Sequence, residues 1–547
     1  YQQFADKAGV TLPPHNSLLS DLVLENYVWK KFVVECLRKG DLPLWNPYLF
    51  CGVPFLAAGQ HSAMYPFSLL FYIMPIVRAY GYFTWLQLLL AGLFTYLFLR
   101  TLHLRTFGAL VGAITFMLSA FMVVSVVFTM IIAAACWLPW LLMMLERIVQ
   151  RWERGERRPP LLELVGGGLG LGMHLLAGHV EIAYYVLLVM AYYALARIAL
   201  VWWRRERGRG WAGVRAAGRT CLWCLAVVGL GMGLGAVQYI PLYELARRSF
   251  REGAVTYQQI AGWAYPIRRV IAFLVPDFFG NPSHHHIFDL FQWEWVPTAR
   301  NLYGQPVTST DWGIKNYVEG GAYLGILPLL LAALAVLSRI KHHISRISES
   351  DKGSVIWIFT LLAVVSLGFV FGTPLYRLIF LLPGINQLHS PFRWIFPYTF
   401  CVAVLAGIGA DKLASRPRLV GWLGWGGLLT GLGTLTALAL SRIFVGPLKP
   451  LLMGIFIKLA KASYTFAGWE LFYSYEVRNL ARFGLLLAGS GAVLLLSRWR
   501  RARQMRWGRF YLWQIGALAL LAADLLLLGY GFNPAADSRL AEFEPPV

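Results

Sequence analysis

The sequence predicts an all-α polytopic membrane protein, because its composition is apolar, its apolar runs are long, and arginines gather between alternate runs. Of its 547 residues, 58% are hydrophobic and the mean hydropathy is +0.57, whereas soluble globular domains are about 45–50% apolar. A helix needs about 20 mostly apolar residues to cross a bilayer. About twelve runs meet this requirement: 80–100, 107–126, 128–146, 161–178, 181–203, 221–241, 321–339, 354–372, 394–414, 418–441, 480–497 and 510–530.

The formal net charge of +22 does not indicate nucleic-acid binding, since the basic residues lie between apolar runs and form no continuous patch. Under the positive-inside rule the connections richest in arginine are cytoplasmic. These connections are 100–105, 147–158, 204–209, 339–346, 412–418 and 498–509. Both termini and the opposite connections are therefore predicted to lie outside the cytoplasmic membrane.

This topology divides the chain into two blocks of six predicted helices, 80–241 and 321–530. The outer segments are a first loop (1–79), a large loop (242–320), two loops of the second block (373–393 and 442–479) and a tail (531–547). The chain starts without a Met or an apolar span, although its first residues are predicted outside. We therefore expect one more helix to precede it.

Two Gly-rich stretches lie within predicted spans, Gly166–Gly172 and Gly229–Gly235. Small residues allow membrane helices to approach closely, so these stretches predict tight helix packing. Cys221 and Cys224 begin a span and are also expected to pack, because a zinc site needs two further ligands nearby.

The first outer loop is the segment in which we expect the active site. Residues Gly40–Pro66 are too polar, aromatic and Pro-rich to cross the membrane, so they predict an ordered loop. Within this loop Asp41 is typical of a turn or cap residue. Cys36 and Cys51 could form a disulfide in an oxidising compartment or remain thiols, and the sequence leaves both open.

Asp21 and Glu25 are four residues apart, which places them on one face of a helix. Partial desolvation beside the membrane would raise the pKa of one of them toward the range of a general base. The alternative is an ordinary pair of solvated carboxylates.

His179 and Glu181 separate two predicted spans on the outer side. Ionisable groups at that depth are costly unless they are paired or used, so they are functional candidates. An interfacial capping pair is the competing interpretation.

Arg247, Arg248 and Arg251 follow a span on the outer side, against the usual charge bias. They could hold an anionic phosphate through their guanidinium groups or contact lipid headgroups. His389 and Arg393 precede a later span, and Arg393 is a second phosphate candidate.

Asp277 and Glu319 add two carboxylates at the edge of the membrane. His284, His285 and His286 lie near Asp289, but adjacent histidines cannot all face one ion. No cofactor is predicted with certainty, and a divalent metal stays open. No nucleotide-binding Gly loop is present, so an activated group is expected to arrive within the membrane.

Several blocks together resemble the bacterial YfhO family across nearly the whole chain. They are Gly40–Phe55, Tyr65–Pro66, Ala177–Glu181, Gln238–Glu244, Val275–Gly280, Tyr317–Pro328 and Asp524–Pro534. The resemblance implies a GT-C-like fold and transfer of a sugar from a polyprenyl phosphate to a cell-envelope glycan or glycolipid. In such enzymes an acid in the first outer loop is the catalytic base, and Asp21 occupies that position.

The chain departs from the family pattern in three places. The family tends to have Gln and Pro after this acid, where Glu25 and Val28 stand here. Family members also begin with a membrane span and continue into an outer C-terminal domain.

Three hypotheses follow. The first is an inverting glycosyltransferase of the bacterial cytoplasmic membrane, with Asp21 as base and Arg393 at the leaving phosphate. Its other binding candidates are Glu25, His179, Glu181, Arg247, Arg248, Arg251, Asp277, Glu319 and His389. The second is a lipid-linked sugar transporter, which the few ionisable residues of the spans disfavour. The third is a structural or accessory subunit of a larger membrane complex.

The partners expected are the lipid donor, the acceptor and membrane lipids, while protein partners stay open.

Overall fold

The computed structural model describes residues 16–248, 255–307, 310–312, 317–318, 320–343, 351–385, 391–533 and 537. The protein is an all-α polytopic membrane protein, as predicted. Within the described residues, nine helices are long and apolar enough to cross a membrane, and three shorter apolar helices accompany them. Each predicted run coincides with one of these helices.

The helices of the two blocks have the following bounds. In the first block they are α5 (Ile76–Thr101), α6 (Thr106–Met117), α7 (Ala120–Val124), α8 (Thr129–Ala135), α9 (Leu138–Glu153), α10 (Leu161–Leu176), α11 (Val180–Val201) and α12 (Trp211–Arg247). In the second block they are α14 (Ile326–His343), α15 (Asp351–Val370), α17 (Ile395–Asp411), α18 (Pro417–Ile443), α20 (Trp469–Leu496) and α21 (Leu512–Gly529).

Short elements lie at the ends of these helices. The short helices are α2 (Val28–Arg38), α3 (Phe55–Ala58), α4 (Leu69–Ile73), α13 (Tyr257–Gly262), α16 (Tyr376–Phe380) and α19 (Val445–Gly454). The strands form three antiparallel pairs, β1 (Trp45–Asn46) with β2 (Val53–Pro54), β3 (His286–Asp289) with β4 (Glu294–Pro297), and β5 (Arg506–Trp507) with β6 (Phe510–Tyr511).

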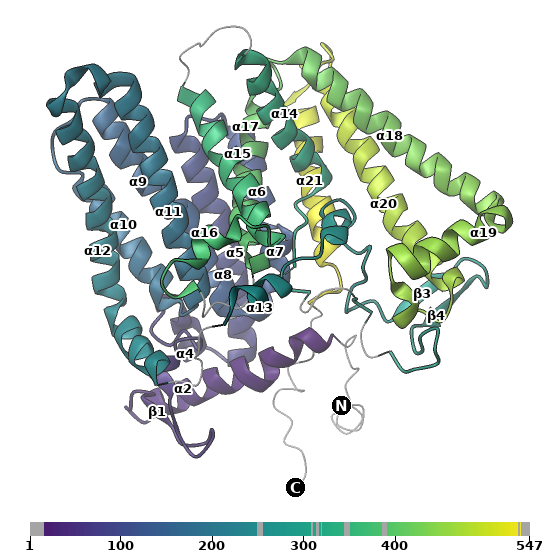
Figure 1. Cartoon of the computed structure of the whole chain (residues 1–547), viewed down its shortest axis with the longest axis horizontal. Coiled ribbons are helices and arrows are strands. Elements are labelled where there is room, and N and C mark those ends of the chain that lie inside the picture. The colour runs from purple at the N-terminus through teal and green to yellow at the C-terminus, as the bar shows by residue number, and fades with distance from the viewer. Residues whose placement is uncertain are drawn as a thin grey trace.

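The helix ends gather at two opposite faces (Figure 1). We call one the loop face, which carries residues 16–68 and 255–307, with α2 lying across the end of the bundle. We call the other the arginine face, which carries the connections 102–105, 154–160, 202–210, 412–416 and 497–511. The loops therefore alternate between two faces, as the charge pattern indicates.

Helix α17 lies at the centre of the bundle. Its side chains from Ile395 to Ala410 are all buried, and it packs against α6, α14 and α15. The Phe400 ring meets the Phe116 ring of α6 with centroids 5.2 Å apart. Since α6 belongs to the first block, α17 joins the two blocks through a continuous apolar core.

Two helices extend further on the loop face than the sequence predicts. Helix α12 continues to Arg247 and α20 begins at Trp469, so parts of 242–320 and of 442–479 are helical rather than loop. The predicted ends follow the loss of hydrophobicity, but a helix continues as long as its backbone hydrogen bonds can form.

The Gly-rich stretches confirm the predicted tight packing, because they belong to α10 and α12, which pack side by side. A Cβ atom placed on Gly167 would meet the Val227 side chain, and one on Gly231 would meet Leu171. Each helix therefore offers glycines to the large side chains of the other. Cys224 is buried within the same helix, α12.

We predict that Gly231→Leu lowers the stability of the protein by about 1–3 kcal/mol, because the new side chain overpacks the contact with Leu171. The measurement is the midpoint of thermal denaturation of the detergent-solubilised protein. Gly233→Leu is the matched control in the same helix, because no atom lies within 4 Å of a Cβ at Gly233. Equal losses for both variants would contradict the packing argument.

Candidate functional site

Residues Gly40–Pro66, predicted to be an ordered loop, fold together with residues 16–39 into a cap on the loop face. Buried polar groups of the cap are hydrogen-bonded to one another. Lys30 Nζ donates a hydrogen bond of 2.5 Å to the His61 carbonyl oxygen. The His61 ring stacks on Phe55 with centroids 4.4 Å apart, and its Nε2 lies 3.0 Å from the Phe55 carbonyl oxygen. Sequence reasoning missed Lys30 and His61, because nothing in their spacing signals burial.

Lys30 is almost completely buried, at 1% exposure. Its ammonium group lies 4.6 Å from the centre of the Phe71 ring. Burial lowers the pKa of Lys30 to about 7, because a charged ammonium is poorly solvated there. The residue is therefore a titratable anchor of the cap.

The cap is attached to two other segments that the sequence analysis singled out. Ser62 Oγ donates to the Ala177 carbonyl oxygen over 2.7 Å, and Gln238 Nε2 donates to the Leu56 carbonyl oxygen over 2.9 Å. Gly178 has a positive φ of 85°, and a Cβ there would overlap the Gly59 carbonyl oxygen. Three blocks that are distant in sequence therefore meet on the loop face.

Asp21 and Glu25 lie where the chain enters the cap, around the π-helical segment Leu22–Tyr27 that leads into α2. The Asp21 side chain is half-buried and Glu25 is exposed. Partial burial, and secondly the charge of Asp21, raise the pKa of Glu25. Within the described residues, neither carboxylate has a hydrogen-bond or ion-pair partner.

The segment that carries Asp21 is attached to a cluster that contains Tyr317 and Phe532. Asn16 Nδ2 donates to the Phe532 carbonyl oxygen over 3.0 Å, and Leu18 packs on a cluster containing Tyr317 and Phe532. The Tyr317 and Phe532 rings stack with centroids 5.5 Å apart. Asp21 is therefore three residues from Leu18, which packs on this cluster.

Tyr317 connects this contact to Asp277, which is buried. The Tyr317 hydroxyl donates to Asp277 Oδ1 over 3.2 Å, and Asn281 Nδ2 donates to the same oxygen over 3.0 Å. Arg482 NH1 lies 3.9 Å from Asp277 Oδ2, and its NH2 donates to the Asp524 carbonyl oxygen over 2.9 Å. Asp277 is therefore one member of a network that extends into the helices of the second block.

The sequence analysis did not assign Tyr317, Arg482 or Asp524 to the site. Arg482 and Asp524 could have been found as charged side chains inside the predicted spans 480–497 and 510–530, whereas Tyr317 carries no such signal.

Glu181 and Arg393 form a second polar cluster on this face. Glu181 Oε1 accepts a hydrogen bond of 2.7 Å from the Tyr185 hydroxyl, and Glu181 Oε2 pairs with Arg393 NH1. His179 Nδ1 accepts from the Ile182 backbone N–H over 3.2 Å, which caps α11. His179 thus has the capping role that the sequence left open, and Glu181 has an ion-pair role.

Arg247 and Arg248 lie at the loop-face end of α12. The Arg247 guanidinium lies 5.9 Å from the centre of the Tyr243 ring. Arg248 pairs with Glu244 over 3.1 Å and its side chain is 78% exposed. No contact among the described residues joins them to Arg393. Arg251, Glu319 and His389 lie outside the described residues.

The histidine run does not form a cluster around one point. His284 Nδ1 lies 3.0 Å from the Tyr475 hydroxyl, whereas His286 is exposed on β3. Asp289 Oδ1 accepts from the Phe291 backbone N–H over 2.8 Å. In the part of the chain that is described, no three His, Cys, Asp or Glu side chains come together as metal ligands. Cys36 and Cys51 are both free thiols.

The spans contain more buried charge than the sequence analysis expected. Arg197 of α11 forms a bidentate pair with Glu146 of α9, at 2.8 and 2.9 Å, and also pairs with Glu153 at 3.0 Å. Glu146 and Arg197 both lie within predicted spans, 128–146 and 181–203, so the sequence contains this pair but does not show that the two residues meet. The buried carboxylates of the described spans, and Arg197, lie within about two turns of a helix end.

No family model and no curated protein matches the chain, so the YfhO resemblance stays a prediction. Two solved structures are similar, both of the Archaeoglobus fulgidus oligosaccharyltransferase. One is AglB in complex with an inhibitory peptide and a dolichol-phosphate, with 12% identity over 81% of this chain and a TM-score of 0.35. The other is the apo form, with 12% identity over 86% and a TM-score of 0.36. The chain spans 52% of each solved chain. At these TM-scores the likeness carries no argument about function.

We predict that the stability of the protein rises with pH between about 7 and 10 through Lys30. In this range the unfolded chain binds a proton at Lys30 that the folded chain releases, so alkaline pH favours folding by up to about 1.4 kcal/mol per pH unit. Lys30→Met should abolish this part of the rise, measured as thermal midpoints across the range. Lys31→Met, at an exposed neighbour, should retain it, and a Lys30 variant with an unchanged slope would refute the assignment.

We also predict that Glu181 and Arg393 are energetically coupled. Arg393→Leu should cost about 3–5 kcal/mol, because it removes the cation that faces a buried carboxylate. The double variant with Glu181→Leu should lose less than the two single losses combined. The measurement is a double-mutant cycle of denaturation midpoints, and strictly additive losses would contradict the pair.

Proposed function

We propose that the protein is a GT-C type glycosyltransferase of the bacterial cytoplasmic membrane, with its site on the loop face at the outer surface. It takes a sugar from a polyprenyl-phosphate donor and transfers it to a cell-envelope glycan or glycolipid. The observation that carries the proposal is the pair Asp21 and Glu25, which lies on the loop face with no partner among the described residues. The YfhO resemblance supports it independently.

The chemistry assigned to Asp21 is that of a general base. Asp21 takes the proton of an acceptor hydroxyl, whose oxygen attacks the anomeric carbon of the donor. The bond from this carbon to the phosphate oxygen breaks, the polyprenyl phosphate leaves with the electron pair, and the configuration inverts. Partial burial and the charge of Asp21 raise the pKa of Glu25, so Glu25 holds a proton more readily than an isolated carboxylate does.

The phosphate gains negative charge as it leaves, so a cation close to it is expected to stabilise the transition state. Arg393 is the proposed ligand, and the ion pair with Glu181 orients its guanidinium group. Arg482 is the cation of the Asp277 network. Preorganised cations of this kind stabilise charge that develops in a transition state.

The position of buried charge favours this proposal over transport. Ion-coupled transporters place ionisable residues near the middle of the membrane. The buried carboxylates of the described spans, and Arg197, lie within about two turns of a helix end, whereas the partly exposed Arg482 lies midway along α20. Glu146, for example, pairs with Arg197 close to the arginine face.

We predict that Asp21→Asn lowers the rate of sugar transfer by about 10²–10⁴-fold, the usual contribution of a positioned general base. The assay supplies the purified protein in proteoliposomes with radiolabelled polyprenyl-phosphate hexoses and envelope glycolipids, and measures label bound covalently to the acceptor. Asp41→Asn is the matched control, because Asp41 is an exposed carboxylate of the same loop.

Full activity of the Asp21 variant would reject the base assignment. Movement of labelled lipid across the bilayer without covalent transfer would support a transporter instead. Neither reaction, combined with purification at fixed stoichiometry in a larger assembly, would support an accessory subunit.

A further inference from the structure

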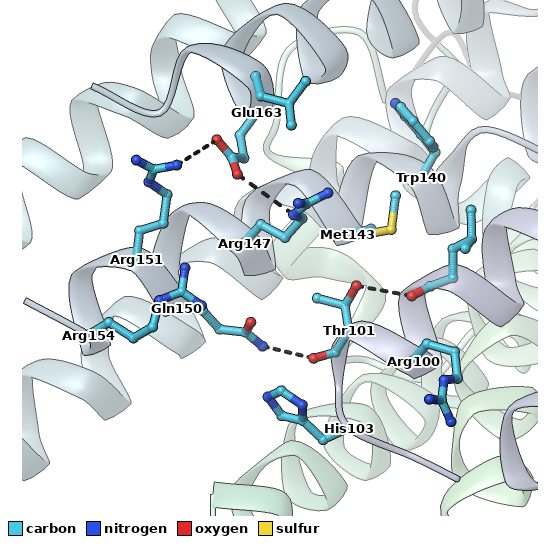
Figure 2. A pocket seen from close by; sticks show the side chains of 12 residues that line it. Arg100, Thr101, His103, Trp140, Met143, Arg147, Gln150, Arg151, Arg154 and Glu163 are labelled. Carbon is cyan, nitrogen blue, oxygen red and sulfur yellow. Dashed lines mark hydrogen bonds and ion pairs between the residues drawn. The ribbon is translucent and has the colours of Figure 1, made fainter. Parts of the chain in front are cut away.

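A groove of about 670 Å³ opens on the arginine face, far from the proposed catalytic site. It lies between the end of α5, one side of α9 and the start of α10 (Figure 2). Four arginines line it, Arg100 from α5 and Arg147, Arg151 and Arg154 from α9 and the turn after it. No part of the proposed sugar-transfer reaction uses this groove.

The groove carries an excess of positive charge. Glu163 is the one carboxylate of its lining, and it lies 3.7 Å from Arg147 and 3.5 Å from Arg151. Glu156, outside the lining, pairs with Arg151 at 3.1 Å and Arg154 at 2.6 Å. The four arginines therefore outnumber both carboxylates, and 42% of the Arg147 side chain is exposed.

The other wall of the groove is apolar. Leu97, Trp140 and Met143 line it and belong to candidate membrane spans. The Trp140 indole is fixed by a hydrogen bond of 2.8 Å from Nε1 to the Gly166 carbonyl oxygen. Leu162 at the start of α10 is 65% exposed. The groove is thus cationic at the end of the spans and apolar where it enters them.

We propose that this groove binds an anionic phospholipid, with its phosphate among the arginines that line it and an acyl chain along Trp140, Met143 and Leu162. The planar guanidinium of arginine matches phosphate oxygens in geometry and charge. Basic pockets between helices at the cytoplasmic surface of membrane proteins bind anionic headgroups. The apolar wall distinguishes a lipid from a free phosphate, because a soluble anion would leave that wall uncovered.

The test measures binding to the delipidated full chain by native mass spectrometry. Phosphatidylglycerol should bind more tightly than phosphatidylethanolamine, and glycerol phosphate should not compete at equal concentration. Arg100→Gln combined with Arg147→Gln should weaken phosphatidylglycerol binding by about 10- to 30-fold, since each arginine near an anionic surface contributes about 1 kcal/mol. The exposed pair Arg500→Gln and Arg501→Gln removes equal charge from the same face and should bind as the wild type does.

The acyl contact has its own matched pair. Leu161 and Leu162 are exposed to almost the same extent, at 67% and 65%, but Leu162 lines the groove and Leu161 does not. Leu162→Gln should weaken phosphatidylglycerol binding and Leu161→Gln should not. The proposal is overturned if both lipids bind equally, if both arginine pairs have the same effect, or if glycerol phosphate displaces the lipid.

Discussion

The ion pair between Glu181 and Arg393 is the interaction on which the arrangement of the loop face depends. It joins α11 of the first block to the residues that lead into α17 of the second. Helix α17 is buried along its length, so its position determines how the two blocks pack. Its other end is held at the arginine face, where Asp411 accepts from the Arg105 backbone N–H over 3.0 Å.

The cap on the loop face connects the two blocks a second time. Its first described residue, Asn16, is bonded to Phe532 near the end of the chain. Further along, Lys30 is buried against Phe71 and bonded to His61. Asp21 lies between these two anchors, so its position depends on contacts at both ends of its segment. A carboxylate on such a braced segment keeps its orientation better than one on an isolated loop.

Charge has different uses at the two faces. On the loop face some charged groups are paired within the structure, as Glu181 is with Arg393 and Asp277 with Arg482. Asp21 and Glu25 have no such partner among the described residues. On the arginine face the positive charge exceeds the available carboxylates, both in the sequence and around the groove of α5, α9 and α10. On the loop face, a few carboxylates without partners suit a catalytic role. On the arginine face, the excess of positive charge suits the binding of an anionic phospholipid.

The sequence by itself determined the helices, their alternation between two faces, and the close packing of the two Gly-rich stretches. These features follow from local composition, since about 20 apolar residues must form a hydrogen-bonded helix in lipid and glycines must face a neighbour to be useful. It also indicated that Asp21 and Glu25 act on each other, because a spacing of four residues is a local property.

Only the tertiary structure decided which polar groups are paired or buried within the protein and which line the groove on the arginine face. His179 caps a helix, Glu181 meets Arg393 across 212 positions of sequence, and Lys30 is buried although its neighbour Lys31 is exposed. Partners so far apart in the chain leave no periodic signal, since they meet through the packing of helices. For the same physical reason, four arginines that read as topology signals in the sequence become the wall of one groove in the folded protein.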